Sequence, residues 1–317
     1  MALFLVTGGA GFIGSNIVKY LLHNTGHSIR VLDDLSSGKK ENLQPVMSKI
    51  DFINGDIRDT ATVEKAVKGV DYVLHLAAIP SVPRSVELPE KTNDVNITGT
   101  LRLLIAARDA KVKRFVFSSS SSIYGDSPKM PKEETMIPDP ISPYGIHKLT
   151  IEYYCRVFRL LYGMPTICLR YFNVFGPSQD PKSEYAAVIP KFITMILQGE
   201  HPTIFGDGEQ TRDFTYVDNV VQANIAACMT DNEANFGQAF NIACGERISL
   251  NDLVREINDI LGKNVTPVYL DPRPGDIKHS LADVTKAKTG LKYTPAIDLR
   301  QGLELTVEWY KQKHNAK

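Results

Sequence analysis

The sequence has 317 residues, enough to bury the core of one large domain or two smaller ones. Hydrophobic residues make up 43% of it, and Lys plus Arg equal Asp plus Glu at 36 each, so net charge gives no attraction to nucleic acid or to an anionic membrane. No apolar run reaches the roughly 18 to 20 residues that cross a bilayer, and the chain opens on a strand pattern without a basic leader. We therefore expect a cytoplasmic protein whose partners include neither nucleic acid nor membrane.

The cysteines predict reduced thiols. Cys155, Cys168, Cys228 and Cys244 show no CxxC spacing and lie in apolar stretches. In a chain of this size that pattern favours buried thiols in a reducing compartment over a disulfide framework. The seven histidines lack the paired spacing of zinc ligands, so no metal is expected.

The first half of the chain alternates short apolar runs with amphipathic segments. Strands are predicted at Leu3–Val6, Ile29–Leu32, Ile50–Ile53, Tyr72–Leu76, Phe115–Phe117 and Thr166–Arg170, and helices at Phe12–Leu22, Ala61–Val67, Thr98–Ala110 and Pro143–Leu161. Strands separated by helical segments indicate βαβ units and a parallel sheet.

The alternation weakens after Asn173, where prolines and glycines cluster and the predicted elements become shorter. The segment Phe214–Ile242 again has a helix-then-strand pattern and is expected to return to the large sheet. The predicted fold class is α/β, with a Rossmann-type doubly wound parallel sheet and a smaller C-terminal mixed α/β lobe. We expect residues 1–172 and 214–243 to form the sheet domain, and 173–213 and 244–317 the lobe.

A glycine-rich turn follows the first predicted strand. Gly8, Gly11 and Gly14 have the spacing G-x-x-G-x-x-G, and Phe12 and Ile13 open the helical pattern. Glycine permits a tight turn and lets backbone N–H groups approach a pyrophosphate, while the helix N-terminus adds a partial positive charge. A lone glycine pattern is a weak signal, but the strand before it and the helix after it supply the required context.

An acidic residue ends the second predicted strand. Asp33 lies 19 residues beyond Gly14 and is followed by Asp34. A carboxylate there accepts hydrogen bonds from the adenosine ribose hydroxyls and repels a 2′-phosphate, which favours NAD over NADP. Asp56, beside Ile57 at the end of the third strand, is either an adenine contact or a plain turn residue. The sequence therefore predicts an NAD site.

Tyr144 and Lys148 lie four residues apart at the start of a predicted helix, so their side chains share one face. Chance alone gives about one such pair in a chain of this composition, so the spacing by itself is weak. A phenol titrates near ~10, and a neighbouring ammonium is expected to lower its pKa by roughly 1 to 3 pH units, toward the range useful for acid–base catalysis. Lys148 is also placed to bind the nicotinamide ribose. Ser120 and Ser122 follow a strand and either hydrogen-bond the reacting hydroxyl or form a solvated turn.

The glycine turn, the strand-end serines and the Tyr-x-x-x-Lys pair together resemble the extended short-chain dehydrogenase/reductase family. Over nearly its whole length the chain is similar to the nucleotide-sugar 4-epimerases of that family, through His75–Ala78, Leu169–Pro177, Gly206–Phe214 and Arg273–Asp276. The resemblance implies that NAD stays bound throughout the cycle and that Tyr144 removes the proton of the sugar 4-hydroxyl as hydride leaves carbon 4. The 4-keto sugar then turns and takes the hydride back on its other face.

The resemblance also implies further contacts. For NAD it adds Leu76, Ala77, Ala78, Ser118 and Tyr171. For a UDP-sugar it implies Ser81, Arg84, Ser122, Asn173, Ala187, Val188, Lys191, Arg212, Arg273, Asp276 and Ser280. Arginines suit a diphosphate because their planar donor forks match its oxygens. A homodimer formed through the helices around 98–110 and 144–161 is implied as well.

Three segments, Ser81–Ser85, Gln179–Lys191 and His279–Asp283, resemble the subgroup that acts on UDP-N-acetylated hexoses. Epimerases restricted to UDP-glucose and UDP-galactose often carry a bulky Tyr where Ser280 falls, whereas a small residue leaves room for a 2-acetamido group. The resemblance thus implies interconversion of UDP-GlcNAc and UDP-GalNAc, with UDP-glucose and UDP-galactose also admitted.

Several alternatives are open. Related 4,6-dehydratases and UDP-glucuronate decarboxylases carry carboxylates in the serine turn, where this chain has Ser121 and Ser122, so both reactions are disfavoured. A non-catalytic NAD sensor would be marked by loss of Tyr144 or Lys148, and both are present. An oxidoreductase that releases NADH and a UDP-uronic acid 4-epimerase require an assay to be separated from the first interpretation.

Overall fold

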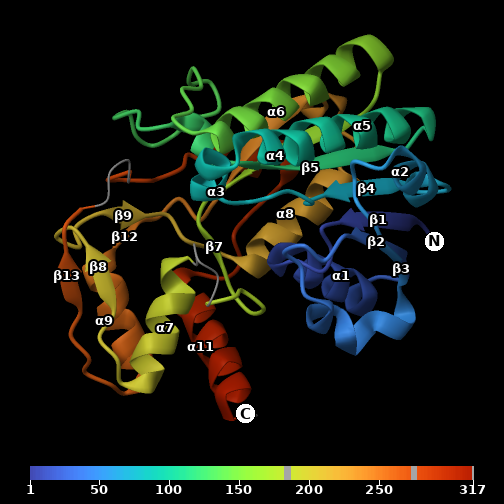
Figure 1. The fold of residues 1–317 in the computed structure, drawn as a ribbon. Helices are drawn as coiled ribbons and strands as arrows, with labels where there is room; N and C mark the ends of the chain where they lie inside the picture. Colours follow the sequence, from blue (N-terminus) through green and yellow to red (C-terminus); the bar gives the residue numbers. More distant parts are fainter. Residues whose placement is uncertain (182–186, 273–276, 316–317) are drawn as a thin grey trace.

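The computed structural model describes residues 1–181, 187–272 and 277–315 (Figure 1). Its largest element is a seven-stranded sheet with the order β11-β6-β5-β4-β1-β2-β3, in which all neighbouring strands are parallel. The strands are β1 (Leu3–Thr7), β2 (Ser28–Asp33), β3 (Asp51–Asn54), β4 (Tyr72–His75), β5 (Arg114–Ser120), β6 (Thr166–Tyr171) and β11 (Gln238–Ile242). Each predicted strand is present, and the segment expected to return to the sheet supplies β11.

Helices cover both faces of this sheet, as Figure 1 shows. On one face lie α1 (Phe12–Asn24) and α8 (Val217–Met229), and on the other α2 (Thr60–Val67), α5 (Thr100–Asp109) and α6 (Pro143–Tyr162). The helix predicted at 98–110 begins later as α-helix, because a π-helical turn, η2 (Asp94–Gly99), precedes α5. Shorter helices are η1 (Lys40–Lys49), α3 (Val82–Glu87), α4 (Pro89–Asn93), η3 (Ser121–Tyr124) and η4 (Glu233–Asn235).

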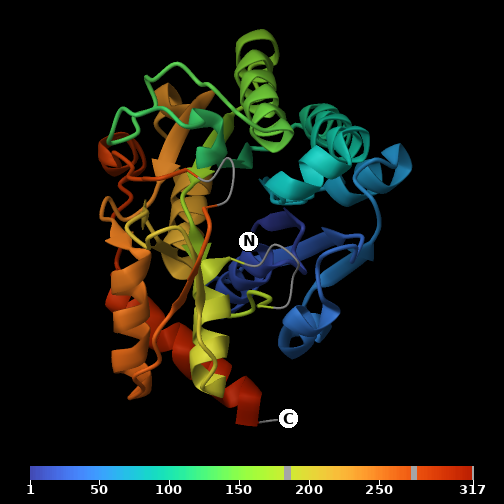
Figure 2. The same ribbon diagram turned by 60° about the vertical axis from the view of Figure 1, so that its left-hand side comes forward.

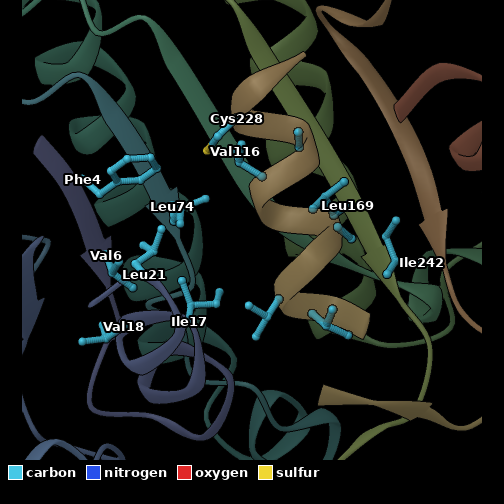
Figure 3. Close-up of a cluster of buried hydrophobic side chains, with 14 of the residues drawn as sticks. Phe4, Val6, Ile17, Val18, Leu21, Leu74, Val116, Leu169, Cys228 and Ile242 are labelled. Carbon is cyan, nitrogen blue, oxygen red and sulfur yellow. The ribbon is translucent and has the colours of Figure 1, made fainter. Parts of the chain in front are cut away.

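Alternating side chains on the strands build one hydrophobic core on each face of the sheet. Phe4 and Val6 pack with α1 and α8, whereas Leu5, between them, packs with α2 and α5. Figure 3 shows the first core, where Leu74 of β4 and Leu21 of α1 lie close together. Strands that are apolar on both faces explain why the apolar runs in the sequence are nearly continuous.

A second group of elements follows β6 along the chain. Its strands form two-stranded sheets: β7 (Val174–Phe175) with β10 (Thr215–Tyr216), β9 (Thr211–Arg212) with β12 (Ile248–Ser249), and β8 (Thr203–Phe205) with β13 (Val268–Leu270). Its helices α7 (Val188–Gln198), α9 (Leu250–Leu261) and α11 (Leu299–Asn315) share a separate core and lie together in both views (Figures 1 and 2). Strands of two or three residues are too short to show a period, which explains the weak alternation there. The remaining helix, α10 (Thr285–Leu291), packs against β11.

None of the described helices is both long and apolar enough to cross a membrane. The four cysteines are free thiols, and Cys155, Cys168 and Cys228 are buried as expected, whereas Cys244 is half-buried. Within the described ranges, no group of three His, Cys, Asp or Glu residues is arranged to hold a metal ion.

The order of the strands determines where a ligand can bind. From β1 the chain moves to β2 and β3 on one side, and it then returns to β4, β5, β6 and β11 on the other side. The connections after β1 and β4 therefore diverge at the carboxyl ends of these two strands. Open α/β sheets bind ligands in the crevice at such a switch point.

Candidate active site

A cavity of about 790 Å³ lies at this switch point. Its walls are the β1–α1 turn, the segments that follow β2, β4 and β6, the end of β5 and the first turns of α6. All fifteen residues predicted to bind the cofactor line this cavity: Gly8, Gly11, Phe12, Ile13, Gly14, Asp33, Asp56, Ile57, Leu76, Ala77, Ala78, Ser118, Tyr144, Lys148 and Tyr171.

The glycines of the β1–α1 turn allow two backbones to approach each other. Gly8 has φ +67°, and a Cβ placed on it would lie 2.7 Å from the Ala77 nitrogen. A Cβ on Gly14 would lie 2.2 Å from the Gly8 carbonyl oxygen, so the first turn of α1 packs directly on the loop. Gly11 is the N-cap of α1 and supplies no side-chain cap, and the first turn holds no acidic residue. The N-terminal N–H groups of α1 thus form a cradle suited to a pyrophosphate.

Asp33 is held firmly at the end of β2. Its Oδ2 accepts a hydrogen bond from the Ala10 N–H at 2.9 Å, and its Oδ1 accepts one from the Leu35 N–H at 2.8 Å. Burial raises the pKa of this carboxyl group, and the two backbone donors oppose that effect. The carboxylate is therefore oriented by the glycine loop itself, in the position that suits a ribose diol.

Asp56 has different partners from Asp33. Its carboxylate pairs with Arg58, whose Nη2 lies 2.6 Å from Oδ2, and Arg58 also reaches Asp94 at 2.9 Å. Hydrogen bonds from Arg58 lower the pKa of Asp56. Asp56 also lines the cavity, so a contact with adenine stays a prediction beside its role in the turn.

Several cavity residues were missed by the sequence analysis. The loop after Asp34 contributes Ser36, Ser37, Gly38 and Asn42, and the polar run Ser-Ser-Gly next to the acidic pair was the available signal. A Cβ on Gly38 would lie 2.8 Å from the Asp33 Oδ1, so a larger residue would displace the carboxylate. Asn96 clamps both backbone groups of Ile79, at 2.8 and 3.2 Å, and nothing in its local sequence indicates that contact.

Tyr144 sits in the first turn of α6. Ser142 caps this helix by accepting the Gly145 N–H, and Pro143 occupies its first position, which explains why the helix begins there. The Tyr144 N–H donates to the Ser85 Oγ at 3.0 Å, and its phenol hydrogen-bonds with Ser120. The phenol is therefore fixed at the end of β5, on the wall of the cavity.

Lys148 lies one turn along the same face of α6 and is 5% exposed. Its Nζ donates to the Ser118 carbonyl oxygen at 2.6 Å and lies 5.6 Å from the centroid of the Tyr144 ring. Burial lowers the pKa of Lys148 to about 8, and the Glu152 carboxylate opposes that effect. A lysine with this pKa is still mostly charged at neutral pH.

The expectation that Lys148 lowers the pKa of Tyr144 is wrong for the protein without its ligands. Burial raises the pKa of Tyr144 to about 12, and only the hydrogen bond with Ser120 opposes this rise. The reason is that desolvation of a phenolate outweighs a cation that is turned toward a backbone carbonyl. Tyr144 is accordingly a phenol at neutral pH until further positive charge comes close to it.

The serines around β5 lie on both sides of this pair. Ser118 and Ser120 belong to β5 and line the cavity. Ser122 lies in η3, which follows the end of β5. The Ser122 Oγ is buried, yet it has no hydrogen-bond partner within residues 1–181, 187–272 and 277–315. An unpaired buried hydroxyl group beside a cavity requires explanation, and a ligand hydroxyl would supply its partner.

The residues predicted to bind the sugar nucleotide are only partly brought together. Ser81, Arg84, Asn173 and Ala187 line the cavity, whereas Ser122, Val188, Lys191, Arg212 and Ser280 do not. Arg212 and Ser280 lie close to each other, since the Ser280 N–H donates to the Thr211 carbonyl oxygen at 3.0 Å. Arg273 and Asp276 lie outside the described residues.

The glycine contacts generate a test of the cofactor site. Gly14→Ala should sharply reduce the NAD that co-purifies with the protein, because its Cβ would meet the Gly8 carbonyl oxygen at 2.2 Å and displace the cradle. Gly26→Ala is the matched control, since a Cβ there meets nothing within 4 Å. NAD released by acid denaturation and measured enzymatically gives the occupancy. Equal occupancy in the two variants would contradict the role of the close contact.

With this geometry in place, comparison with known proteins identifies the family. Residues 4–243 match the NAD dependent epimerase/dehydratase family. A solved UDP-N-acetylglucosamine 4-epimerase from Methanobrevibacter ruminantium, in complex with UDP-N-acetylmuramic acid, is 44% identical, with a TM-score of 0.93 over 98% of this chain and 99% of that one. The UDP-glucose 4-epimerase of Mycolicibacterium smegmatis is 41% identical over 98% of each chain.

A third relative carries both ligands in its crystal structure. The UDP-glucuronic acid 4-epimerase from Bacillus cereus, in complex with UDP-glucuronic acid and NAD, is 36% identical, with a TM-score of 0.91 over 98% of this chain and 99% of that one. The predicted fold and cofactor are thereby confirmed. The chain belongs to the NAD-dependent epimerase/dehydratase family, as a nucleotide-sugar 4-epimerase that uses NAD.

Proposed function

We propose that this enzyme interconverts UDP-GlcNAc and UDP-GalNAc, and that it also accepts UDP-glucose and UDP-galactose. The observation that carries the proposal is the Tyr144 phenol on the wall of the cavity, with Ser120 beside it and Lys148 one helical turn away. This arrangement provides a proton acceptor for a sugar hydroxyl next to a dinucleotide site. The choice of N-acetylated sugars rests on Ser280 and on the segments that resemble that subgroup.

The chain's own residues fit NAD along the whole cavity. The N-terminus of α1 would hold the pyrophosphate, Asp33 the adenosine ribose, and Lys148 the nicotinamide ribose. Bound NAD supplies a site that accepts hydride from carbon 4 of the sugar and returns it. Because the same NAD is regenerated in each turnover, we expect it to remain tightly bound.

Tyr144 would take the proton of the sugar 4-hydroxyl and later return it. Ser120 hydrogen-bonds the phenol, and the Ser122 hydroxyl, which is buried, is positioned to receive a sugar hydroxyl. Lys148, whose ammonium is held at the same end of β5, does not by itself offset the burial of the phenol. Its charge would act on the developing phenolate together with the positive ring of bound NAD. The turn η3 presents Ser121 and Ser122, whose hydroxyls lack the acidity needed to eliminate water.

Specificity for the sugar would come from the segment around Ser280. That residue is half-buried, and its backbone is paired with Thr211, next to Arg212. The 44% identical protein from M. ruminantium is named for UDP-N-acetylglucosamine, which supports the proposal. A second candidate, 4-epimerisation of a UDP-uronic acid, is supported by the relative from B. cereus, at the lower identity of 36%.

The defining assay supplies UDP-GlcNAc to the purified enzyme without adding NAD. UDP-GalNAc should appear in proton NMR spectra, while absorbance at the NADH wavelength should not increase, because the hydride returns to the sugar. Accumulation of NADH would contradict epimerisation. Turnover that is restricted to UDP-uronic acids would contradict the proposed substrate.

Tyr144→Phe is the matched variant for this assay. It removes one oxygen, so bound NAD should be retained while turnover falls at least ~10²-fold, as expected for loss of a general acid–base group. Turnover like that of the wild type would remove Tyr144 from the mechanism.

The substrate assignment has its own test. Ser280→Tyr should reduce kcat/KM for UDP-GlcNAc at least ~10-fold more than for UDP-glucose, because the ring would fill the space of the 2-acetamido group. Ser280→Ala, which stays small, should keep the preference of the wild type. Equal losses on both sugars in the tyrosine variant would contradict a role of Ser280 in specificity.

We also propose a homodimer that is formed through α5 and α6. The outer face of α6 exposes large apolar side chains, including Val157, Leu160 and Leu161, and α5 adds Ile105. A contiguous apolar surface of this kind marks an interaction site more often than a solvated face. Two copies related by a two-fold axis would bury it.

Sedimentation or light scattering tests the dimer. Leu160→Lys places a charge where 69% of the side chain is exposed, and it should shift the protein toward monomers. Leu305→Lys on α11 is the control, because Leu305 is also exposed, at 48%, and the helix α11 lies well apart from α6 in both views (Figures 1 and 2). If Leu160→Lys stays dimeric at micromolar concentration, the interface lies elsewhere.

We place the enzyme in the cytoplasm as well. Cys155, Cys168 and Cys228 are buried thiols, a use of cysteine that is typical of reducing compartments.

A further inference from the structure

A buried ion pair joins the catalytic helix α6 to strand β6. Glu152 is one turn beyond Lys148 on α6, and its carboxylate is bound in bidentate fashion by Arg170 of β6. The Arg170 Nε lies 2.9 Å from Oε1, and its Nη2 lies 2.7 Å from Oε2. The side chains of both residues are less than a tenth exposed, at 8% and 6%. Removing two charges from water is costly, so this pair requires a reason beyond packing.

The pair is tied to the end of β5 that carries the catalytic serines. The Ser119 Oγ donates to the Glu152 Oε1. Ser119 stands between Ser118, whose carbonyl oxygen receives the Lys148 ammonium, and Ser120, which hydrogen-bonds the phenol. Glu152 thereby fixes Ser119, the β5 residue between Ser118 and Ser120. Ser118 contacts Lys148, and Ser120 contacts Tyr144.

The same network continues toward the sugar side of the site. The Arg170 Nη1 donates to the Tyr124 hydroxyl group at 2.8 Å, and that hydroxyl donates to the Asn241 Oδ1 at 2.7 Å. The Asn241 Nδ2 in turn donates to the Asp283 carbonyl oxygen at 3.1 Å. Asp283 is three residues beyond Ser280, so buried polar contacts join α6 to the segment proposed to select the sugar.

The groups around Lys148 leave Glu152 as the one carboxylate that acts on it among the described residues. The groups that face Lys148 or its partner are Tyr144, His147 and Glu152 on α6, His75 on β4, and Cys168 and Arg170 on β6. Burial lowers the pKa of both histidines and raises that of the Cys168 thiol, so these three are neutral near pH 8. The charge of Lys148 is therefore supported by the Ser118 carbonyl oxygen and, among these titratable groups, by Glu152.

We infer that Glu152 is a positioning residue for epimerisation, which holds the end of β5 against α6 through Ser119 and keeps the Lys148 ammonium charged in its buried place. The inference rests on the proposed roles of Tyr144 and Lys148. It assigns to the Glu152–Arg170 pair an effect on the chemical step, separate from binding of NAD or of the UDP-sugar. A contribution limited to stability would leave the pH dependence of turnover unchanged.

The test uses Glu152→Gln in the purified holoenzyme, with UDP-GlcNAc and UDP-glucose as substrates. The amide keeps the size of the side chain and one acceptor for Arg170, while it removes the charge. We expect kcat to fall at least ~10-fold at pH 8, with KM within about twofold and an unchanged content of NAD. Loss of the opposing charge lowers the pKa of Lys148 further, so the alkaline limb of kcat should move down by about 0.5 to 1 pH unit.

Glu134→Gln is the matched control. Glu134 is a half-buried glutamate at the other end of the network, where it accepts the N–H of Asn241 in β11 at 2.7 Å. It should keep the alkaline limb of the wild type even if its melting temperature drops. An equal shift in both variants, or wild-type kcat and pH profile in Glu152→Gln, would overturn the inference.

Ser119→Ala decides the matter if Glu152→Gln yields no folded holoenzyme. It removes one hydroxyl group, and kcat should fall about 3- to 10-fold with KM and the content of NAD unchanged. Wild-type kcat in this variant would overturn the inference. A wild-type enzyme that turns over neither sugar would instead overturn the proposed function, and this inference with it.

Discussion

The site depends on keeping a lysine ammonium charged although it is buried. Lys148 is 5% exposed, and it retains its charge because the Ser118 carbonyl oxygen and the Glu152 carboxylate replace water around it. The same burial raises the pKa of Tyr144 to about 12 and lowers the pKa of Lys148 to about 8. The protein alone thus holds Tyr144 as a neutral phenol next to a lysine whose pKa is about 8. Additional positive charge near the phenol would lower its pKa toward the range of a general base.

The cavity that this pair lines depends on backbone contacts that only glycine permits. Gly8 meets Ala77 at the end of β4, and Gly14 meets the carbonyl oxygen of Gly8. These contacts bring the N-terminus of α1, the end of β2 and the segment after β4 into one cavity. The order of the strands makes the crevice, and the glycines make it deep enough for a dinucleotide.

The sequence predicted most of the sheet and of the cofactor site, because both depend on local patterns. Buried parallel strands appear as apolar runs, and the glycine turn and Asp33 lie at fixed distances along the chain. The pKa of Tyr144 could not be predicted, since it depends on desolvation by residues that are distant in sequence. The clamp of Asn96 on Ile79 and the pair of Glu152 with Arg170 are likewise tertiary contacts without a local pattern. In the lobe, strands of two or three residues gave no period to read.

Hydrogen bonds to Asp213 hold together the segments on the proposed sugar side of the site. The Asp213 carboxylate accepts hydrogen bonds from the Cys244, Gly245 and Ala282 N–H groups at 3.1, 3.1 and 3.2 Å. The Asn173 Nδ2 donates to the Asp213 carbonyl oxygen at 3.0 Å, so one residue joins the segments after β6 and β11 to the one near Ser280. Such a frame can be kept while individual side chains on it change. Relatives that are named for UDP-N-acetylglucosamine and UDP-glucuronic acid keep TM-scores of 0.93 and 0.91 to this chain. A change of sugar within this fold therefore does not require a different frame, and the sheet need not change with it.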